Sequence, residues 1–328
     1  MFERPATSAA APRILVVGVG GGGCKAVNRM VQHGLQGVAF AAIDSDAAPL
    51  AQTLAPRSLL LGAQGRGAQA DPQVGSELAR DHQDAIAELV RGQELVLVVA
   101  GLGAGTGGGA APIVCEVARK AGAVVLGAVT LPFHFEGPRR GKQALNSLGD
   151  MKAEAIMTVA LPGSGIWEGF AKRGAEIRGK EGIPVFAEGD RVLFGAVRSL
   201  RDLASGTDGV ASVAGAHGLA VMGVGVARGQ HRVREAVGQA RQSPMLAGMN
   251  LRHAHRIWVT FHGAAHLDRS EATKIAREIG EANGAHPDLV VGWSIDDSMG
   301  NAVEVTVLAT GADAAIHTAV QSKGLSGM

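Results

Sequence analysis

The chain has 328 residues, 46% of them hydrophobic, and its 31 Lys and Arg residues nearly balance its 30 Asp and Glu residues. This length allows two domains with large cores, whereas a net charge of +1 supplies no basic field for nucleic acid. No apolar run reaches the roughly 18 residues of a membrane span, and the only cysteines, Cys24 and Cys115, lie far apart, so we expect a cytoplasmic protein without nucleic-acid partners or direct membrane contact.

The first structured unit combines a strand, a glycine turn and a helix. Arg13–Gly20 is a β-branched apolar run, and after three further glycines Cys24–Gly34 carries apolar residues at helical spacing. The glycines satisfy G-x-G-x-x-G, and Asp44 closes the next buried strand about 20 residues further on. These features are typical of a dinucleotide-binding Rossmann unit, so an NAD-dependent oxidoreductase is one alternative.

A second glycine-rich stretch, Gly101–Pro112 (GLGAGTGGGAAP), lies between the apolar run Glu94–Ala100 and a helix expected from Ile113. Such a loop brings backbone N–H groups close to an anion, which predicts a phosphate site. A merely flexible loop is the structural alternative, but Pro112 in the first turn of the helix argues against it. One dinucleotide pyrophosphate does not require two such loops, so together they favour a nucleoside triphosphate.

The remaining chain continues the alternation of helices and strands before its organisation changes. After a polar loop at 62–75 we expect helices at 76–92 (with Ser76 as N-cap), 113–122 and beyond 133, with strands at 123–130 and 156–162. An irregular stretch follows at 163–182. Beyond it we expect strands at 219–229, 255–263, 288–297 and 302–311 and helices at 231–242 and 270–284. This predicts an α/β fold in which a doubly wound parallel-sheet nucleotide-binding domain is joined by a central helix to a smaller α+β domain. The boundaries are a disordered leader at 1–12, the nucleotide-binding domain at 13–190, the central helix at 191–205, the α+β domain at 206–311 and a short tail at 312–328.

With these stretches identified, the chain resembles the FtsZ/tubulin family of cytoskeletal GTPases. The resemblance runs in order from about Arg13 to Gly311, and GAGTGGGAAP corresponds to the family's tubulin signature. The other matching stretches are GVGGGGCKAVNRMVQHGLQGVAFAAIDSDA, GQELVLVVAGLGAGTGGGAAPIV, GAVTLPFHFEGPRR, RQSPML and VEVTVLATG. The resemblance implies GTP or GDP as cofactor, with Mg²⁺ as a candidate companion ion.

Family roles transfer to matching positions of this chain. Phosphates would be wrapped by Gly20, Gly21, Gly22, Gly23, Gly103, Ala104, Gly105, Thr106, Gly107, Gly108 and Gly109, and the γ-phosphate would be sensed by Gly67 and Ala68. Glu136 and Arg140 would hold the ribose and Phe186 would stack on guanine, and Asp44 and Pro132 complete the predicted site. Several positions depart from the family. Lys25 replaces an asparagine, although its ammonium group could neutralise phosphate. Gln69 replaces a glycine, Gly108 replaces a threonine, and Gly163-Ser164-Gly165 replaces an asparagine-bearing turn.

In the family that the chain resembles, an aspartate recognises guanine by accepting hydrogen bonds from the N1 and N2 protons of the base. Counting from Phe186, that position falls at Arg191, whose guanidinium has no acceptor, while Asp190 stands one residue earlier. Guanine selection is therefore open at this point. Asp190 would substitute if the helix begins at a different residue.

The loop after the central helix supplies two acids and an asparagine for hydrolysis in the family. Here the span Ser205–Gly218 is shorter and contains one acid, Asp208, and neither Asp202 nor Glu235 has the motif's spacing. Positioning groups of this kind dominate phosphoryl transfer, so we expect Asp208 as the catalytic candidate and hydrolysis that is weak or absent. An active FtsZ-type GTPase of cell division is the alternative.

Partners are also implied by the resemblance. We expect head-to-tail assembly of the chain with itself into filaments, and an FtsZ paralogue as a further partner. The sequence ends 17 residues after Gly311, so we expect no contact with membrane adaptors through a long C-terminal linker. His253, His255, His262 and His266 form no consistent ligand face, and no metal site is predicted from them.

Overall fold

The computed structural model describes residues 11–172, 184–206, 208–215, 217–264, 270, 272, 273, 275 and 288–321. Its strands are β1 (Ile14–Val19), β2 (Ala39–Asp44), β3 (Arg57–Leu60), β4 (Leu95–Gly101), β5 (Val124–Thr130), β6 (Met157–Leu161), β7 (Gly218–Arg228), β8 (Arg256–Gly263), β9 (Asp288–Ile295) and β10 (Ala302–Thr310). Its α-helices are α1 (Gly20–Gln32), α2 (Ala47–Ala51), α3 (Pro72–Asp81), α4 (Gln83–Val90), α5 (Gly105–Lys120), α6 (Pro138–Glu154), α7 (Gly163–Lys172), α8 (Pro184–Ala204), α9 (Ala211–Ala214), α10 (Arg232–Arg241) and α12 (Asp313–Gln321). Short 3₁₀ helices are η1 (His134–Glu136), η2 (Pro244–Leu246), η3 (Leu251–His253) and η4 (Asp297–Met299).

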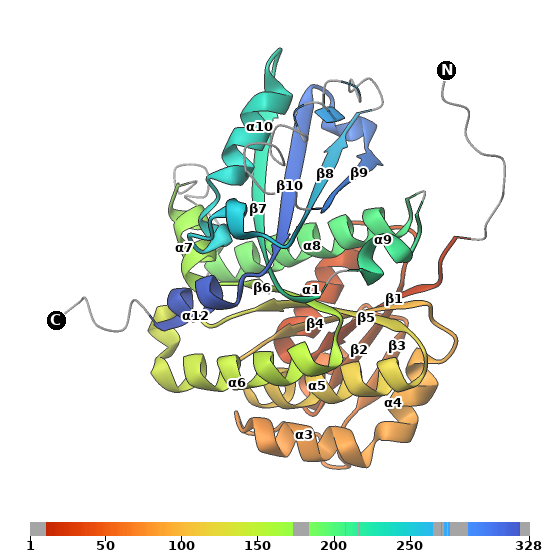
Figure 1. Cartoon of the computed structure of the whole chain (residues 1–328). Coiled ribbons are helices and arrows are strands. Elements are labelled where there is room, and N and C mark those ends of the chain that lie inside the picture. Colours follow the sequence, from red (N-terminus) through yellow and green to blue (C-terminus); the bar gives the residue numbers. More distant parts are fainter. Residues whose placement is uncertain are drawn as a thin grey trace.

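All ten of these strands belong to one sheet, in the order β3-β2-β1-β4-β5-β6-β7-β10-β8-β9. The sheet is mostly parallel, and β10 is antiparallel to its neighbours β7 and β8. The predicted boundary between the two domains is crossed by the sheet, because β6 pairs with β7 from Met157↔Gly218 to Val159↔Ala220. Helix α8 lies between the two parts of this mixed α/β fold (Figure 1). No described helix is long and apolar enough to span a membrane.

The core lies on both faces of the sheet, which explains the continuous apolar runs of the central strands. In β1, Leu15 and Val17 belong to one buried cluster, and Ile14 and Val16 belong to the other. Helix α5 packs in the first cluster, whereas α1 and α8 pack in the second. A strand that is buried on both faces has no polar alternation, so the predicted strands of the first domain were recognisable as short apolar runs.

Four segments differ from the sequence prediction. Helix α3 begins at Pro72 with Asp71 as its N-cap, because the Asp71 side chain accepts from Gln73 N at 2.9 Å, and Ser76 lies inside the helix. Helix α5 begins at Gly105 rather than Ile113, so four glycines and two alanines of the expected loop are helical. Residues from Gly163 form α7 instead of an irregular stretch, and α8 starts at Pro184, before the predicted central helix.

Several short elements were not predicted, β3 and α2 among them, and one end of the chain differs from expectation. The edge strand β3 and helix α2 are only four and five residues long, too short for a periodic signal. The expected short tail contains α12, which buries Ile316 and pairs Asp313 with Lys152 of α6. The leader lies outside the described residues up to residue 10, as does most of the predicted helix at 270–284.

Candidate functional site

The carboxyl ends of β4 and β5 open onto a cavity of about 260 Å³. Parallel strands place their following loops at one edge of a sheet, where ligands of open α/β folds bind. Several predicted site residues line this cavity: Gly22, Lys25, Ala104, Pro132, Glu136, Arg140, Phe186 and Asp190. They come from four segments that are far apart in sequence, so the fold brings together most of the side chains predicted to contact a nucleotide.

Helix α1 presents its first turn at this edge. Gly20–Gly23 are the first helical residues rather than a free loop, and the preceding Val19 provides no side-chain cap. Gly20 has φ of +72° and lies against the first turn of α5, where a Cβ would be 2.7 Å from Gly107 N. The first N–H groups of a helix have no intrahelical partner. Such groups at the start of a helix are suited to an anion.

Helix α5 presents its own first turn beside that of α1, with Ala104 as an N-cap that also makes no side-chain hydrogen bond. The glycines of this turn also allow neighbouring backbone to approach closely. A Cβ on Gly105 would lie 2.8 Å from Ala68 O, and one on Gly107 would lie 2.4 Å from Gly101 O. Their absent side chains therefore make room for neighbouring backbone, while their N–H groups remain available at the helix start.

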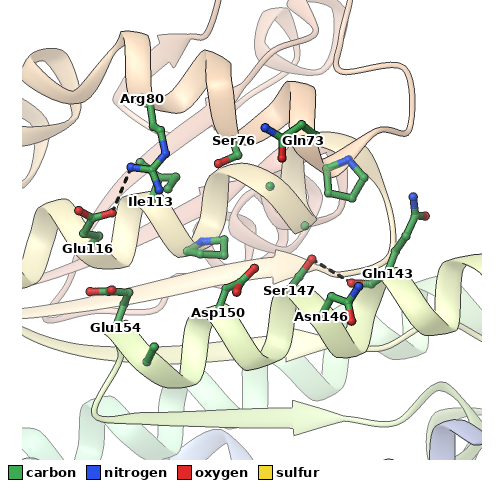
Figure 2. A pocket seen from close by; sticks show the side chains of 15 residues that line it. Gln73, Ser76, Arg80, Ile113, Glu116, Gln143, Asn146, Ser147, Asp150 and Glu154 are labelled. Atoms are coloured by element: carbon green, nitrogen blue, oxygen red, sulfur yellow. Dashed lines mark hydrogen bonds and ion pairs between the residues drawn. The ribbon is translucent and has the colours of Figure 1, made fainter.

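Gly108 and Gly109 do not reach the cavity, although both were predicted to wrap phosphate. They line a separate groove of about 470 Å³ between α3, α5 and α6, shown in Figure 2. A Cβ on Gly109 would lie 1.9 Å from Pro72 O, so this glycine permits close packing of α3 on α5. In the same groove Arg80 pairs with Glu116, and Ser147 Oγ donates to Gln143 O at 3.0 Å (Figure 2).

The loop that follows β2 is joined to the start of α5. Ser45 Oγ and Thr106 Oγ1 are 2.5 Å apart, and Gly67 N donates to Ser45 O at 2.9 Å. These contacts hold Gly67 and Ala68, the predicted γ-phosphate sensor, beside the start of α5. Gln69 has φ of 47°, in the left-handed region that favours glycine. The non-glycine residue at this position is therefore accommodated in a strained backbone.

Opposite the helix starts, Glu136 and Arg140 are held by each other. Arg140 pairs with Glu136 Oε2, while Glu136 Oε1 accepts from Phe133 N at 2.9 Å. Gly103 supports this part of the wall, because a Cβ there would lie 2.6 Å from Pro132 Cγ and 2.7 Å from Arg140 O. The two predicted ribose residues thus face the cavity in a fixed orientation.

An aromatic group forms the other end of the cavity. Phe186 is 44% exposed and makes edge contacts with Phe133 at 5.2 Å and with Phe135 at 6.2 Å between ring centroids. An exposed ring beside a cavity is suited to stacking with a planar base. Asp190 lies one helical turn further along α8 and also lines the cavity.

The structure places Asp190, and not Arg191, in the wall of the cavity. Because α8 begins at Pro184, Phe186 and Asp190 are separated by one turn of the same helix and share its cavity face. Arg191 is directed elsewhere and donates from Nη2 to Glu188 Oε1 at 2.8 Å. Burial raises the pKa of Asp190 to about 6, although Arg29 and Lys25 oppose this effect.

Asp208 does not belong to this cavity. It is exposed in the turn after α8, and the 14 residues from Asp190 to Ala204 span about 21 Å of helix. The predicted catalytic acid and the predicted base-reading acid therefore lie at opposite ends of α8. Within one molecule, Asp208 cannot contact a ligand in the cavity.

Several lining residues were not predicted from the sequence: Gly101, Leu102, Thr130, Leu131, Phe133, Ile166, Gly189 and Leu193. Helical spacing would have identified two of them, because Gly189 and Leu193 follow Phe186 at i+3 and i+7 on α8. The residues after β4 and β5 follow from the rule that strand ends line the site. In the described part of the chain, no three His, Cys, Asp or Glu side chains are placed to hold a metal ion.

Comparison with known proteins yields two family matches and several similar structures. Residues 13–167 match the GTPase domain of the Tubulin/FtsZ family, and residues 218–313 match the C-terminal domain of the FtsZ family. A mutant FtsZ from M. jannaschii is 31% identical with a TM-score of 0.80, covering 93% of this chain and 92% of that chain. An empty FtsZ dimer from M. jannaschii is 29% identical with a TM-score of 0.82, covering 93% and 90%. A GTPγS-bound protofilament of CetZ2 from Haloferax volcanii shares the fold at 18% identity, with a TM-score of 0.74 and coverage of 94% and 97%.

Proposed function

Since the chain belongs to the Tubulin/FtsZ family and contains its GTPase domain, we propose that it binds GTP or GDP in the cavity at the carboxyl edge of the sheet. The observation that carries this proposal is the convergence of two uncapped helix starts, α1 and α5, with Phe186 and Asp190 in one place. Helix starts attract phosphate, and a carboxylate beside an aromatic ring suits the hydrogen-bond donors of guanine. Mg²⁺ is proposed only as a companion of the nucleotide phosphates.

Individual residues take the following parts in this proposal. The N–H groups of Gly20–Gly23 and Gly105–Gly107 hold the phosphates, and Lys25 adds a positive charge. The paired side chains of Glu136 and Arg140 contact the ribose. Phe186 stacks on the base and Asp190 accepts its N–H protons, which is why guanine is the preferred base.

The alternative of a nicotinamide enzyme shares the strand order β3-β2-β1-β4-β5-β6 with this domain. Strand order alone therefore does not separate the two functions. The family matches over both parts of the chain favour the GTPase class. Within that class, an active GTPase of cell division remains the second candidate.

We further propose that the protein is cytoplasmic and assembles head to tail, with itself or with an FtsZ paralogue, and hydrolyses GTP weakly or not at all. Assembly is supported by the similar structures, which include an FtsZ dimer and a CetZ2 protofilament. The position of Asp208 at the far end of α8 suits a contact with the next molecule rather than its own cavity. One acid in place of two is the reason to expect slow hydrolysis.

The test is to denature the purified protein and to separate the released small molecules by anion-exchange chromatography. We expect GDP or GTP at a substantial fraction of one per chain. Protein isolated without nucleotide is incubated with GDP, ADP and NAD in parallel. Retention of NAD, or no retention of any guanine nucleotide, would contradict the proposed function.

A further inference from the structure

Asp44 is a buried acid at the end of β2 that the proposed function does not use. Its side chain is 2% exposed. Oδ1 accepts from Ser45 N at 2.8 Å and from Asp46 N at 3.2 Å. Oδ2 is buried and makes no regular hydrogen bond among the described residues. A buried carboxylate oxygen without a hydrogen-bond partner destabilises the folded protein, because burial removes its hydration.

This oxygen lies beside the start of α1. A Cβ built on Gly21 would be 3.9 Å from Asp44 Oδ2, so the carboxylate is next to the first turn of the 13-residue helix. The N-cap Val19 contributes no side-chain hydrogen bond there. The negative charge of Asp44 thus lies at the helix start that the proposed function assigns to phosphate.

The groups around Asp44 provide no compensating cation. From α1 it faces Cys24, whose pKa is raised to about 12 by burial, so the thiol is neutral. From α5 it faces the neutral Thr106 hydroxyl, which lies 2.5 Å from Ser45 Oγ and partly lowers the pKa of Asp44. Its own segment adds the like charge of Asp46, whose backbone pairs with that of Arg66 in an isolated β-bridge. Among the described residues no Lys or Arg forms an ion pair with Asp44.

Burial and the charge of Asp46 raise the pKa of Asp44, while the two backbone N–H groups and Thr106 lower it in part. A phosphate placed at the start of α1 would bring a second negative charge next to Oδ2. Like charges that share a site favour protonation of one of them. The carboxyl group is therefore poised to take up a proton when an anion arrives.

We propose that phosphate binding at the start of α1 requires the carboxylate of Asp44 to be neutralised, and that nucleotide binding is therefore coupled to proton uptake at Asp44. This inference rests on the proposed function, because it concerns the same phosphate site. Protonation turns Oδ2 from a repelling charge into a hydroxyl that can donate to a phosphate oxygen. Affinity for polyphosphates then rises as the pH falls, by at most tenfold per pH unit while one proton is taken up.

The experiment measures binding of GDP and of inorganic pyrophosphate by calorimetry at pH 7.5, in two buffers that differ in ionisation enthalpy. Pyrophosphate has no base, so its binding excludes any contribution from Asp190. With EDTA present, we expect the wild-type protein to take up between a fraction of a proton and one proton per ligand. Asp44→Asn, which is isosteric with the neutral acid, is expected to take up none and to bind both ligands about tenfold or more tightly.

Asp46→Asn is the matched control, because it removes a neighbouring charge but can still cap α2 through its side-chain oxygen; it should retain the proton uptake. Asp44→Ala is a second neutral variant, and thermal unfolding confirms that each variant is folded. Equal proton uptake and equal affinity in wild type and Asp44→Asn would overturn the inference while leaving nucleotide binding intact. Wild-type binding that takes up no proton and requires Mg²⁺ would also overturn it, whereas failure of every variant to bind either ligand would instead contradict the proposed function.

Discussion

Asp190 and Arg191 are consecutive residues of α8 that face different surroundings. Asp190 lines the cavity with Phe186, whereas Arg191 pairs with Glu188 and lines a hollow with Arg29 and Phe194 on another side of the helix. Successive residues of an α-helix diverge by about 100°, so they rarely serve one site. A shift of one residue along α8 would therefore replace the carboxylate acceptor in the cavity by a guanidinium.

Replacing Asp190 should weaken guanine binding more than any change at the neighbouring position. Asp190→Ala removes charge-assisted acceptors and should reduce GDP affinity by about 1.5 to 3 kcal/mol, or roughly one to two decades. Arg191→Lys, which can retain the pair with Glu188, should leave the affinity within about twofold. Fluorescence titration with a labelled GDP measures both variants. A larger loss in Arg191→Lys than in Asp190→Ala would reverse the assignment.

Selectivity between bases should depend on pH. Asp190 accepts guanine protons only as a carboxylate, and its pKa is raised to about 6. Lowering the pH through about 6 protonates Asp190 in the ligand-free protein. The ratio of GDP affinity to ADP affinity should therefore decrease at pH values below about 6 and stay constant above about pH 7. The ratio cancels effects on the phosphates, which the two ligands share. In Asp190→Asn the ratio should be independent of pH, and a wild-type ratio that rises on acidification would contradict this role.

The glycines of α5 should be required for folding as well as for ligand binding. A Cβ on Gly107 would be 2.4 Å from Gly101 O, in backbone that has little freedom to move. Gly107→Ala should therefore lower the free energy of unfolding by more than about 2 kcal/mol, as overpacked sites do. Gly149→Ala in α6 is the control, since a Cβ there meets nothing within 4 Å and should stabilise by about 0.5 to 1 kcal/mol. Denaturant unfolding compares them, and equal stabilities would refute the packing argument.

A buried ion pair connects α8 to the C-terminal part of the sheet. The side chains of Arg198 and Glu304 are only 12% and 14% exposed. Glu304→Gln leaves the buried guanidinium without its counter-charge, so we expect a loss of about 3 kcal/mol or more. The exposed pair of Arg91 and Glu88 offers a control, in which Glu88→Gln should change the free energy of unfolding by less than about 1 kcal/mol. Similar losses for the two substitutions would show that burial does not matter here.

Hydrolysis should be slow and should not depend on assembly. Loss of a water-orienting acid lowers rates by about two to four decades, and Asp208 alone replaces the two acids expected after the central helix. Phosphate release is followed together with light scattering over a range of protein concentrations, with GTP in excess. We expect release far below one turnover per minute, with no change in Asp208→Ala. Faster release that accompanies assembly and disappears in Asp208→Ala would identify an active GTPase.

Much of the cavity wall could be predicted from the sequence, because the residues that line the cavity follow strand ends or lie in glycine-rich turns. Gly22 and Ala104, for example, lie in the two glycine-rich stretches that the pattern of strand, glycines and helix identified, and both line the cavity. The helical state of Gly105–Gly109 could not be predicted in the same way, because glycine is a poor helix former. Here contact with Ala68, Gly101 and Pro72 overrides that preference.

The helix α7 was missed for a similar reason. Gly163 and Gly165 suggested an irregular turn, but a Cβ on either would clash with backbone of Pro132 or Pro244. These glycines mark tight packing rather than a break, a distinction that depends on segments distant in sequence. The face shared by Phe186, Gly189 and Asp190 becomes apparent only when α8 includes all three, which the later start expected for this helix did not allow.

The pairing of β6 with β7 has a consequence for the integrity of the molecule. All five residues of β6 are buried, and its free side is covered by β7 of the second domain. A fragment ending after α8 would expose β6 as a bare edge strand, the kind of surface that recruits foreign strands and aggregates. A proteolytic nick in the connection between α8 and β7 would be different, because strand pairing and the α8 contacts would still hold the pieces together. One sheet therefore runs through both parts of the chain, and the second part covers an edge of the first that would otherwise be exposed.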